Sequence, residues 1–144
     1  FARHGIVPER LLFLGDGQGR HDHLARHRLV DVALDPFPFT GCTTTFEALW
    51  MGVPVVSLKG ERFLGRTGLC HLAAVGLEDL AAPDEDAYVR IAAGLALDLD
   101  RLAGLRRDLR RRVAVSPLID APAYARAMET AFRDMWRAWC ARPR

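Results

Sequence analysis

Lysine is almost absent from this sequence. Lys59 is the only one in 144 residues, arginine supplies the other positive side chains, and the net charge at pH 7 is only +2. Such a small charge gives no strong attraction to nucleic acid or to an anionic membrane surface, and we expect neither as a partner. No apolar run reaches the ~20 residues that a helix needs to cross a bilayer, so no membrane-spanning segment is expected.

Cysteine is scarce as well. Cys42, Cys70 and Cys140 form no C-x-x-C pair, and their spacing matches no zinc-binding pattern. We therefore expect no metal site and a reduced, cytoplasmic setting, with Cys70 and Cys140 buried as small apolar side chains. Internal repeats and low-complexity segments are also absent.

The apolar segments that are present follow the order of an α/β fold. Half of the residues are hydrophobic, which is enough for the core of one ordinary domain. Expected strands cover residues 10–15, 31–39, 53–58 and 77–82, and the helices between them cover residues 21–30, 43–52 and 62–75. In the first of these helices, Leu24 and Leu29 are expected to face inward. The strands lack polar and apolar alternation, so both faces of the sheet should be covered. This predicts a Rossmann-like, doubly wound parallel sheet.

The rest of the sequence has helical patterns. Helices are expected over residues 84–97, 99–114 and 121–141, with Asp84 and Asp120 as N-caps. We assign residues 1–82 to the α/β core and residues 83–144 to a helical C-terminal part of the same domain.

One of these helices carries an apolar stripe. Its members recur at spacings of three and four: Leu102, Leu105, Leu109 and Val113. They should face the core and the arginines between them should face water, although an anion- or RNA-binding surface is a second interpretation of those arginines. In the last helix, Trp136 and Trp139 are expected to pack rather than to bind a ligand.

Three loops lie at the carboxyl ends of expected strands, where ligands bind in an open parallel sheet. They cover residues 15–22, 36–43 and 59–65. The second loop leads from Gly41 into a helix whose N-terminal amides and dipole favour an anion. Thr43 and Thr44 can add hydroxyl donors, and Glu47, one turn further, can accept hydrogen bonds from a ribose. This combination indicates a nucleotide or a nucleotide sugar.

Simpler interpretations of the same residues stay open. Thr44 and Glu47 also fit a capping box, in which the two side chains cap a helix N-terminus and bind no ligand. His23, taken alone, fits an ordinary surface histidine as well as a ligand contact. The loop "GDGQG" is a weak signal, because it is neither a G-x-G-x-x-G nor a Walker A pattern.

Three blocks of sequence stand out, and they occur in this order: "DVALDPFPFTGCTTTFEALWMGVPVVSLKGERFLGRTG", "HLAAVGLEDLAA" and "SPLIDAPAYARAMETAFRDMW". Together they resemble the C-terminal catalytic region of O-linked N-acetylglucosamine transferases, nearest to the bacterial branch and the SPINDLY-like proteins. The resemblance implies the nucleotide-binding lobe of a GT-B glycosyltransferase with a helical C-terminal tail. It also implies an N-terminal catalytic lobe and tetratricopeptide repeats before Phe1, so we expect this chain to be the C-terminal part of a longer protein.

The resemblance further implies an activity. It is the inverting, metal-independent transfer of a sugar from a nucleoside diphosphate to Ser or Thr of a protein acceptor, without a cofactor. UDP-N-acetylglucosamine is the expected donor, and GDP-fucose and UDP-glucose compete with it. Two hypotheses from different classes are a degenerate, non-catalytic binding module and an unrelated α/β phosphate-binding enzyme. The catalytic groups, including a family lysine, would lie outside this chain, so the chain alone should not turn over.

Particular residues acquire roles from the same resemblance. Thr43 and Thr44 would hold the diphosphate next to Gly41, and Glu47 would bind the ribose hydroxyls. Cys42 departs from the pattern, because animal enzymes have a histidine there, and any contact made by that imidazole would be missing.

Residues of the preceding loop and helix would recognise the base. His23 would pack near the uracil with Arg26 beside it. Arg20 would touch the nucleotide, and the backbone of Gln18 would face the edge of the base.

Overall fold

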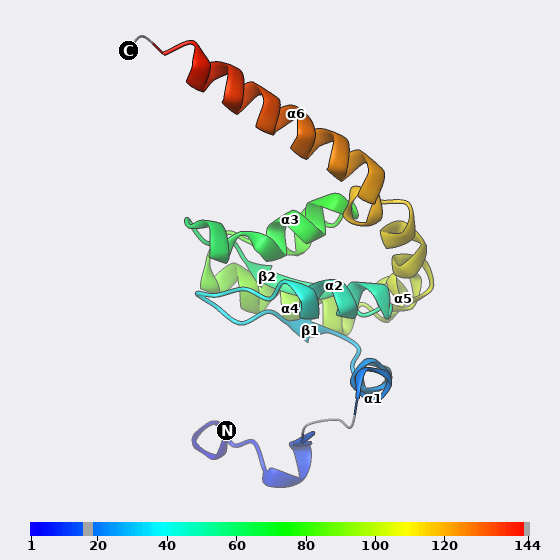
Figure 1. The fold of residues 1–144 in the computed structure, drawn as a ribbon. Coiled ribbons are helices and arrows are strands. Elements are labelled where there is room, and N and C mark those ends of the chain that lie inside the picture. Colours follow the sequence, from blue (N-terminus) through cyan, green and yellow to red (C-terminus); the bar gives the residue numbers. More distant parts are fainter. Residues whose placement is uncertain (16–18, 143–144) are drawn as a thin grey trace.

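Three short parallel strands organise the fold (Figure 1). The computed structural model describes residues 1–15 and 19–142, apart from the side chain of Arg20. The strands are β1 (Ala33–Leu34), β2 (Val55–Leu58) and β3 (Ala81–Ala82). They lie in the order β1-β2-β3, and both neighbouring pairs are parallel, which confirms the predicted fold class.

Helices follow each strand and make up the rest of the regular structure. The α-helices are α1 (Arg20–Ala25), α2 (Thr43–Trp50), α3 (Thr67–Ala74), α4 (Glu85–Leu97), α5 (Leu99–Ala114) and α6 (Ala121–Cys140). Short 3-10 helices lie between them: η1 (Ala2–His4), η2 (Pro8–Arg10), η3 (Arg26–Leu29), η4 (Phe63–Gly65), η5 (Glu78–Leu80) and η6 (Pro117–Ile119).

The central strand, β2, is covered on both faces. Val55, Val56 and Ser57 are all buried, and successive side chains of a strand point to opposite faces. Helices α3 and α4 both lie against β2 and β3. The absence of polar alternation in this segment therefore has the physical reason that the sequence predicted.

Helix α5 closes the core with the apolar stripe that its sequence predicts. Leu105, Leu109 and Val113 are buried, and Leu102 packs against them. One arginine of the opposite face has a structural partner, because the Arg106 guanidinium donates hydrogen bonds to the carbonyls of Val30 (2.8 Å) and His27 (3.3 Å). This arginine ties α5 to the segment that enters β1.

Three of the later helices begin at an aspartate that caps them. The carboxylates of Asp84, Asp98 and Asp120 accept hydrogen bonds from backbone amides three residues further on, at 2.7 to 2.9 Å. Two of these caps, Asp84 and Asp120, were predicted from the sequence. Each satisfies an amide that the first helical turn leaves without a partner.

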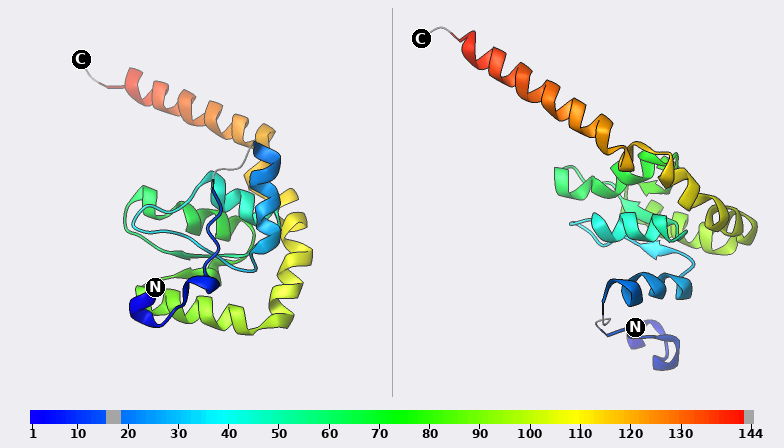
Figure 2. Two further views of the ribbon diagram at one scale, coloured as in Figure 1. Left: turned by 90° about the horizontal axis from the view of Figure 1, so that it is seen from below. Right: turned by 45° about the vertical axis from the view of Figure 1, so that its right-hand side comes forward.

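The N-terminal segment corrects two expectations. Residues 10–15 form no strand: η2 ends at Arg10 and an extended chain follows, with Leu12 and Phe13 exposed. Figures 1 and 2 show this segment apart from the sheet, so it has no neighbouring strand to pair with. Leu29, expected to face inward, is exposed as well.

Helix α6 extends away from the α/β domain (Figures 1 and 2). None of its residues is buried, and Trp136 and Trp139 are each more than 60% exposed, so the packing expected for them does not occur within this chain. Cys70 and Cys140 are exposed too, contrary to the prediction. Among the described residues, no helix is both long and apolar enough to cross a membrane.

We expect Leu109→Ala to destabilise the α/β domain by about 2–5 kcal/mol, because it empties a fully buried site where α5 packs on α2 and α4. Leu97→Ala is the matched control, since the Leu97 side chain is 84% exposed at the end of α4. Urea unfolding of the full-length protein measures both, and equal midpoints for the two variants would contradict the assignment of the core.

Candidate functional site

The candidate site lies where the chain leaves β1 and enters α2. Residues 35–42 connect the two elements at the carboxyl end of the sheet (Figure 1). We call residues 40–44 the Gly41 loop. Open parallel sheets bind ligands at this edge, because the loops that follow neighbouring strands converge there.

The N-terminus of α2 differs from those of α4, α5 and α6, which aspartates cap. Cys42 occupies the N-cap position, and its side chain makes no capping hydrogen bond. Among the described residues, the backbone amides of Cys42, Thr43 and Thr44 have no hydrogen-bond acceptor. The side chains of Thr43 and Thr44 are exposed beside them. These donors can therefore bind an anion without breaking a bond inside the protein.

Glu47 pairs with a histidine from a distant part of the sequence. Its carboxylate Oε2 lies 3.1 Å from Nε2 of His23 on α1, and the Glu47 side chain is largely buried. Because the carboxylate is directed toward His23, Thr44 and Glu47 do not form the capping box that their spacing allowed. Instead, two predicted site residues meet beside the uncapped end of α2.

The other predicted residues are distributed around this pair. Arg26 begins η3, directly after α1, and is partly buried. Gln18 lies outside the described residues, and so does the side chain of Arg20, whose backbone begins α1. Three further predicted residues are consecutive in the sequence and lie at the N-terminus of α2: Cys42, Thr43 and Thr44.

The buried carboxylate of Asp35, the residue after β1, fixes the Gly41 loop from the protein interior. Asp35 is only 4% exposed and accepts three hydrogen bonds. Its Oδ1 accepts from the Gly41 amide (2.9 Å) and from the Thr45 hydroxyl (3.0 Å), and its Oδ2 accepts from the Ser57 hydroxyl (2.8 Å). A buried charge is tolerated only where such bonds replace its hydration, so this arrangement makes the loop and the carboxylate depend on each other.

Hydroxyl groups fix the same loop from its other side. The Thr67 hydroxyl donates to the carbonyl of Gly41 (3.1 Å), and it also lies 2.6 Å from the hydroxyl of buried Thr40. Thr40 in turn bonds the Leu64 carbonyl through its hydroxyl, at 2.9 Å. Both polar groups of Gly41 are therefore committed within the protein.

Two glycines leave room for this network. A Cβ at Gly41 would collide with Asp35 Oδ1 and with the hydroxyls of Thr44 and Thr45. A Cβ at Gly68 on α3 would collide with the Ser57 hydroxyl and with the other carboxylate oxygen. Close approach rather than an unusual backbone angle therefore requires glycine at both positions.

An aromatic contact supports the end of β1. The Tyr88 hydroxyl on α4 donates to the Asp35 carbonyl (2.8 Å), and the Tyr88 ring meets Phe37 edge to face. Burial, and then the charge of Asp35, raise the pKa of Tyr88, which stays a hydrogen-bond donor at neutral pH. Beyond Phe37 lies an open hollow of about 560 Å³, between residues 37–39 and residues 60–65.

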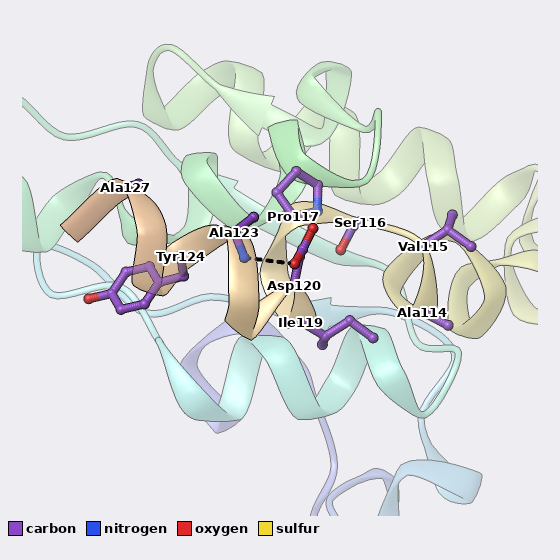
Figure 3. Close-up of a pocket in the computed structure, with 9 residues that line it drawn as sticks. All are labelled: Ala114, Val115, Ser116, Pro117, Ile119, Asp120, Ala123, Tyr124 and Ala127. Atoms are coloured by element: carbon purple, nitrogen blue, oxygen red, sulfur yellow. Dashed lines mark hydrogen bonds between the residues drawn. The ribbon is translucent and has the colours of Figure 1, made fainter. Parts of the chain in front are cut away.

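A second hollow, of about 690 Å³, lies at the junction of α5, η6 and α6 (Figure 3). Its lining is mostly small and apolar, and its only ionisable carboxylate, Asp120, already caps α6 through the Ala123 amide. This hollow offers no groups for chemistry. No cluster of three potential metal ligands occurs in the described part of the chain either.

The sequence did not reveal Asp35, Thr40, Ser57 and Thr67 as supports of the site. Asp35 does carry one signal, since it is a carboxylate at the end of the apolar run "DVALD". A charge at the carboxyl end of a buried strand needs several donors, and the Gly-Thr-rich loop that follows could have been recognised as their source.

An α/β chain with an uncapped helix N-terminus at the carboxyl edge of its sheet has the form of a nucleotide-binding domain. Residues 1–128 match the sequence model of glycosyl transferase family 41. This chain belongs to that glycosyltransferase family, and the resemblance to O-linked N-acetylglucosamine transferases and SPINDLY-like proteins is confirmed.

Individual relatives agree with this assignment. The probable UDP-N-acetylglucosamine–peptide N-acetylglucosaminyltransferase SPINDLY of Solanum lycopersicum is 42% identical over 136 residues, which are 94% of this chain and 15% of that protein. The UDP-N-acetylglucosamine–peptide N-acetylglucosaminyltransferase of Caenorhabditis elegans is 33% identical over 138 residues, or 96% of this chain and 12% of that protein.

A solved structure agrees as well. A mutant O-GlcNAc transferase of Thermobaculum terrenum superposes with a TM-score of 0.88 at 42% identity, over 96% of this chain and 26% of that chain. The present chain thus spans about a sixth or less of the curated relatives' length and about a quarter of the solved one.

We expect His71 to make the stability of the fold depend on pH. Its Nδ1 is buried on α3 and has no hydrogen-bond partner among the described residues. Burial lowers the pKa of His71 below 6.5, and the nearby negative charge of Asp35 opposes this shift only in part. The folded protein therefore resists protonation of His71, and stability is lost as pH falls through about 6.5, the unfolded value.

We expect His71→Leu to protect the fold against acid. Its apparent Tm should exceed that of the wild type by a margin that grows between about pH 7.5 and pH 5.5, across the ordinary titration range of histidine. His21→Leu is the matched control, because the His21 side chain is 94% exposed. A margin that does not change with pH would contradict this role of His71.

Proposed function

We propose that this chain forms the donor-binding part of a protein O-glycosyltransferase. The donor is a nucleoside diphosphate sugar, UDP-N-acetylglucosamine foremost, whose diphosphate binds at the N-terminus of α2. The observation that carries the proposal is the uncapped start of this helix, with three amides and two threonine hydroxyls available in one place.

The charge of a diphosphate matches this arrangement. Amides at a helix N-terminus carry partial positive charge, and no carboxylate is needed to cap α2. In the same chain, α4, α5 and α6 each begin at an aspartate that would repel a phosphate. Only α2, among these four helices, therefore presents an end suited to an anion.

His23 and Glu47 supply the groups for the nucleoside. Glu47 can accept hydrogen bonds from ribose hydroxyls, and its bond to His23 orients the carboxylate before the ligand arrives. The exposed part of the His23 ring, with Arg26 three residues further along the chain, offers a flat surface for the base.

The transfer reaction needs stabilisation of its leaving group. Negative charge develops on the nucleoside diphosphate as the bond to the sugar breaks, and preorganised amides and hydroxyls stabilise that charge without rearranging. We infer that transfer is inverting and independent of metal, with the helix end taking the electrostatic role. The open hollow beside Phe37, between residues 37–39 and 60–65, is the space that we propose for the sugar.

Other parts of the enzyme would complete the reaction. We expect the catalytic groups, the binding site for a protein Ser or Thr, and tetratricopeptide repeats to lie outside these 144 residues, in a cytoplasmic protein. GDP-fucose and UDP-glucose are the competing donors, and selection between them would depend in part on those other regions.

We expect the full-length protein to bind UDP in the presence of EDTA, and Thr44→Ala and Glu47→Ala each to weaken binding by about 1.5–3 kcal/mol, the cost of a lost hydrogen bond to a charged group. Isothermal titration with UDP, GDP and their sugar conjugates measures this and identifies the base.

Two variants on α6 serve as matched controls. Thr130→Ala removes an exposed threonine hydroxyl, and Glu129→Ala removes a carboxylate paired with Arg133, both away from the site. UDP affinities equal to the wild type in Thr44→Ala and Glu47→Ala would overturn the site. No binding of either nucleotide by the wild type would favour a degenerate, non-catalytic module.

A further inference from the structure

We propose that Asp35 is a positioning residue for the sugar donor. Its buried carboxylate holds the Gly41 loop in the shape in which Thr43 and Thr44 face the diphosphate. The inference rests on the proposed function and extends it, because Asp35 is only 4% exposed and acts through the loop rather than by contact with the ligand.

Asp35 is itself held rigidly at the end of β1. Its amide donates to the Val56 carbonyl (2.9 Å), and its carbonyl accepts from the Tyr88 hydroxyl (2.8 Å). The carboxylate is thus anchored to the sheet and to α4 before any ligand binds. Because the Gly41 amide is bonded to this carboxylate, the position of the Gly41 loop is fixed relative to the sheet.

The bonds of Gly41 set the direction of the amides that follow it. Its amide is turned inward to Asp35, and its carbonyl is turned to the Thr67 hydroxyl. Because a peptide group is planar, the fixed Gly41 carbonyl sets the direction of the Cys42 amide. The Cys42 carbonyl accepts from the Phe46 amide (3.0 Å), and this bond sets the direction of the Thr43 amide in the same way. Both amides are left without acceptors in the described part of the chain, at the start of α2.

The Asp35 carboxylate binds only one of the three consecutive threonines. Thr45 is buried and donates its hydroxyl to Asp35, whereas Thr43 and Thr44 are exposed. Removing the acceptor would leave the Thr45 hydroxyl and the Gly41 amide buried without a partner. The loop would then be driven to rearrange toward water, with loss of the donor arrangement.

The bonds matter here more than the charge. A negative charge behind an anion site repels the ligand, so an isosteric neutral group should be tolerated if it keeps the geometry. Asparagine can keep one oxygen toward Gly41 and Thr45 and direct its NH2 group to the Ser57 hydroxyl, which can accept. Asp35→Asn should therefore keep the shape of the Gly41 loop and the affinity for the donor, whereas Asp35→Ala should lose both.

Ser57→Ala is the matched control. It deletes one bond to the same carboxylate, at Oδ2, without touching the Gly41 loop. It should lower stability as the loss of any buried hydrogen bond does, but it should not alter the loop. Comparing Ser57→Ala with Asp35→Ala therefore distinguishes a loss of stability from a loss of donor binding.

The experiment has two readouts on the full-length protein, taken well below the apparent Tm of each variant. Hydrogen exchange followed by mass spectrometry reports on the peptide that spans residues 39–46, and isothermal titration reports UDP affinity. We expect Asp35→Ala to accelerate exchange in this peptide and to weaken UDP binding about ten-fold or more, whereas Asp35→Asn and Ser57→Ala stay within about three-fold of the wild type.

Gly41→Ala is a second route to the same result if Asp35→Ala does not fold. Its Cβ displaces the loop while the carboxylate stays, and the same loss of UDP affinity is expected. Wild-type exchange and wild-type affinity in a folded Asp35→Ala or Gly41→Ala variant would overturn the proposal. So would Asp35→Asn as weak as Asp35→Ala, since charge would then matter more than geometry.

The two proposals can fail separately. If the wild type binds no UDP, the proposed function falls, while the exchange of residues 39–46 still decides whether Asp35 orders the loop. If the wild type binds UDP and the loop exchanges alike in all variants, the donor site stands and the positioning role is lost.

Discussion

The hydrogen bonds to the Asp35 carboxylate connect the parts of the site. A carboxylate that is almost fully buried must be satisfied by donors, and here the donors come from the Gly41 loop, from α2 and from β2. The position of strand, loop and helix is therefore settled together rather than one by one. Two glycines, Gly41 and Gly68, leave room for this hydrogen-bond network. The Thr67 hydroxyl completes it by donating to the Gly41 carbonyl.

A consequence of this arrangement is a helix end with unused donors. Helices α4, α5 and α6 each satisfy one of their first amides with an aspartate, which is an ordinary way to stabilise a helix start. Helix α2 is held in place by its packing on β2, α3 and α5 and by the Asp35 network, so it has no need of a side-chain cap. The helix is therefore stable without a group bound at its N-terminus, and that end is available for an anionic ligand. The ligand that we propose for this end is a nucleoside diphosphate sugar, which agrees with membership in glycosyl transferase family 41.

Sequence patterns predicted those features that depend on neighbours in the chain. The apolar stripe of α5 and the caps at Asp84 and Asp120 follow from spacings of three or four residues, and all were confirmed. Asp35 was missed because its three partners lie 6, 10 and 22 residues away, so the fold alone brings them together. The strand expected at residues 10–15 was wrong because an apolar run needs a neighbouring strand to pair with. Trp136 was expected to pack because periodicity identifies an apolar face but says nothing of what covers it.

The central claim is that the start of α2 is where the diphosphate binds, and a crystal structure of the full-length protein with UDP tests it most directly. The account predicts phosphate oxygens within hydrogen-bond distance of the amides and hydroxyls of Thr43 and Thr44. It also predicts that the bond between Gly41 and Asp35 is unchanged from the present structure. UDP bound elsewhere, or a Gly41 amide turned away from Asp35 toward the ligand, would contradict the account.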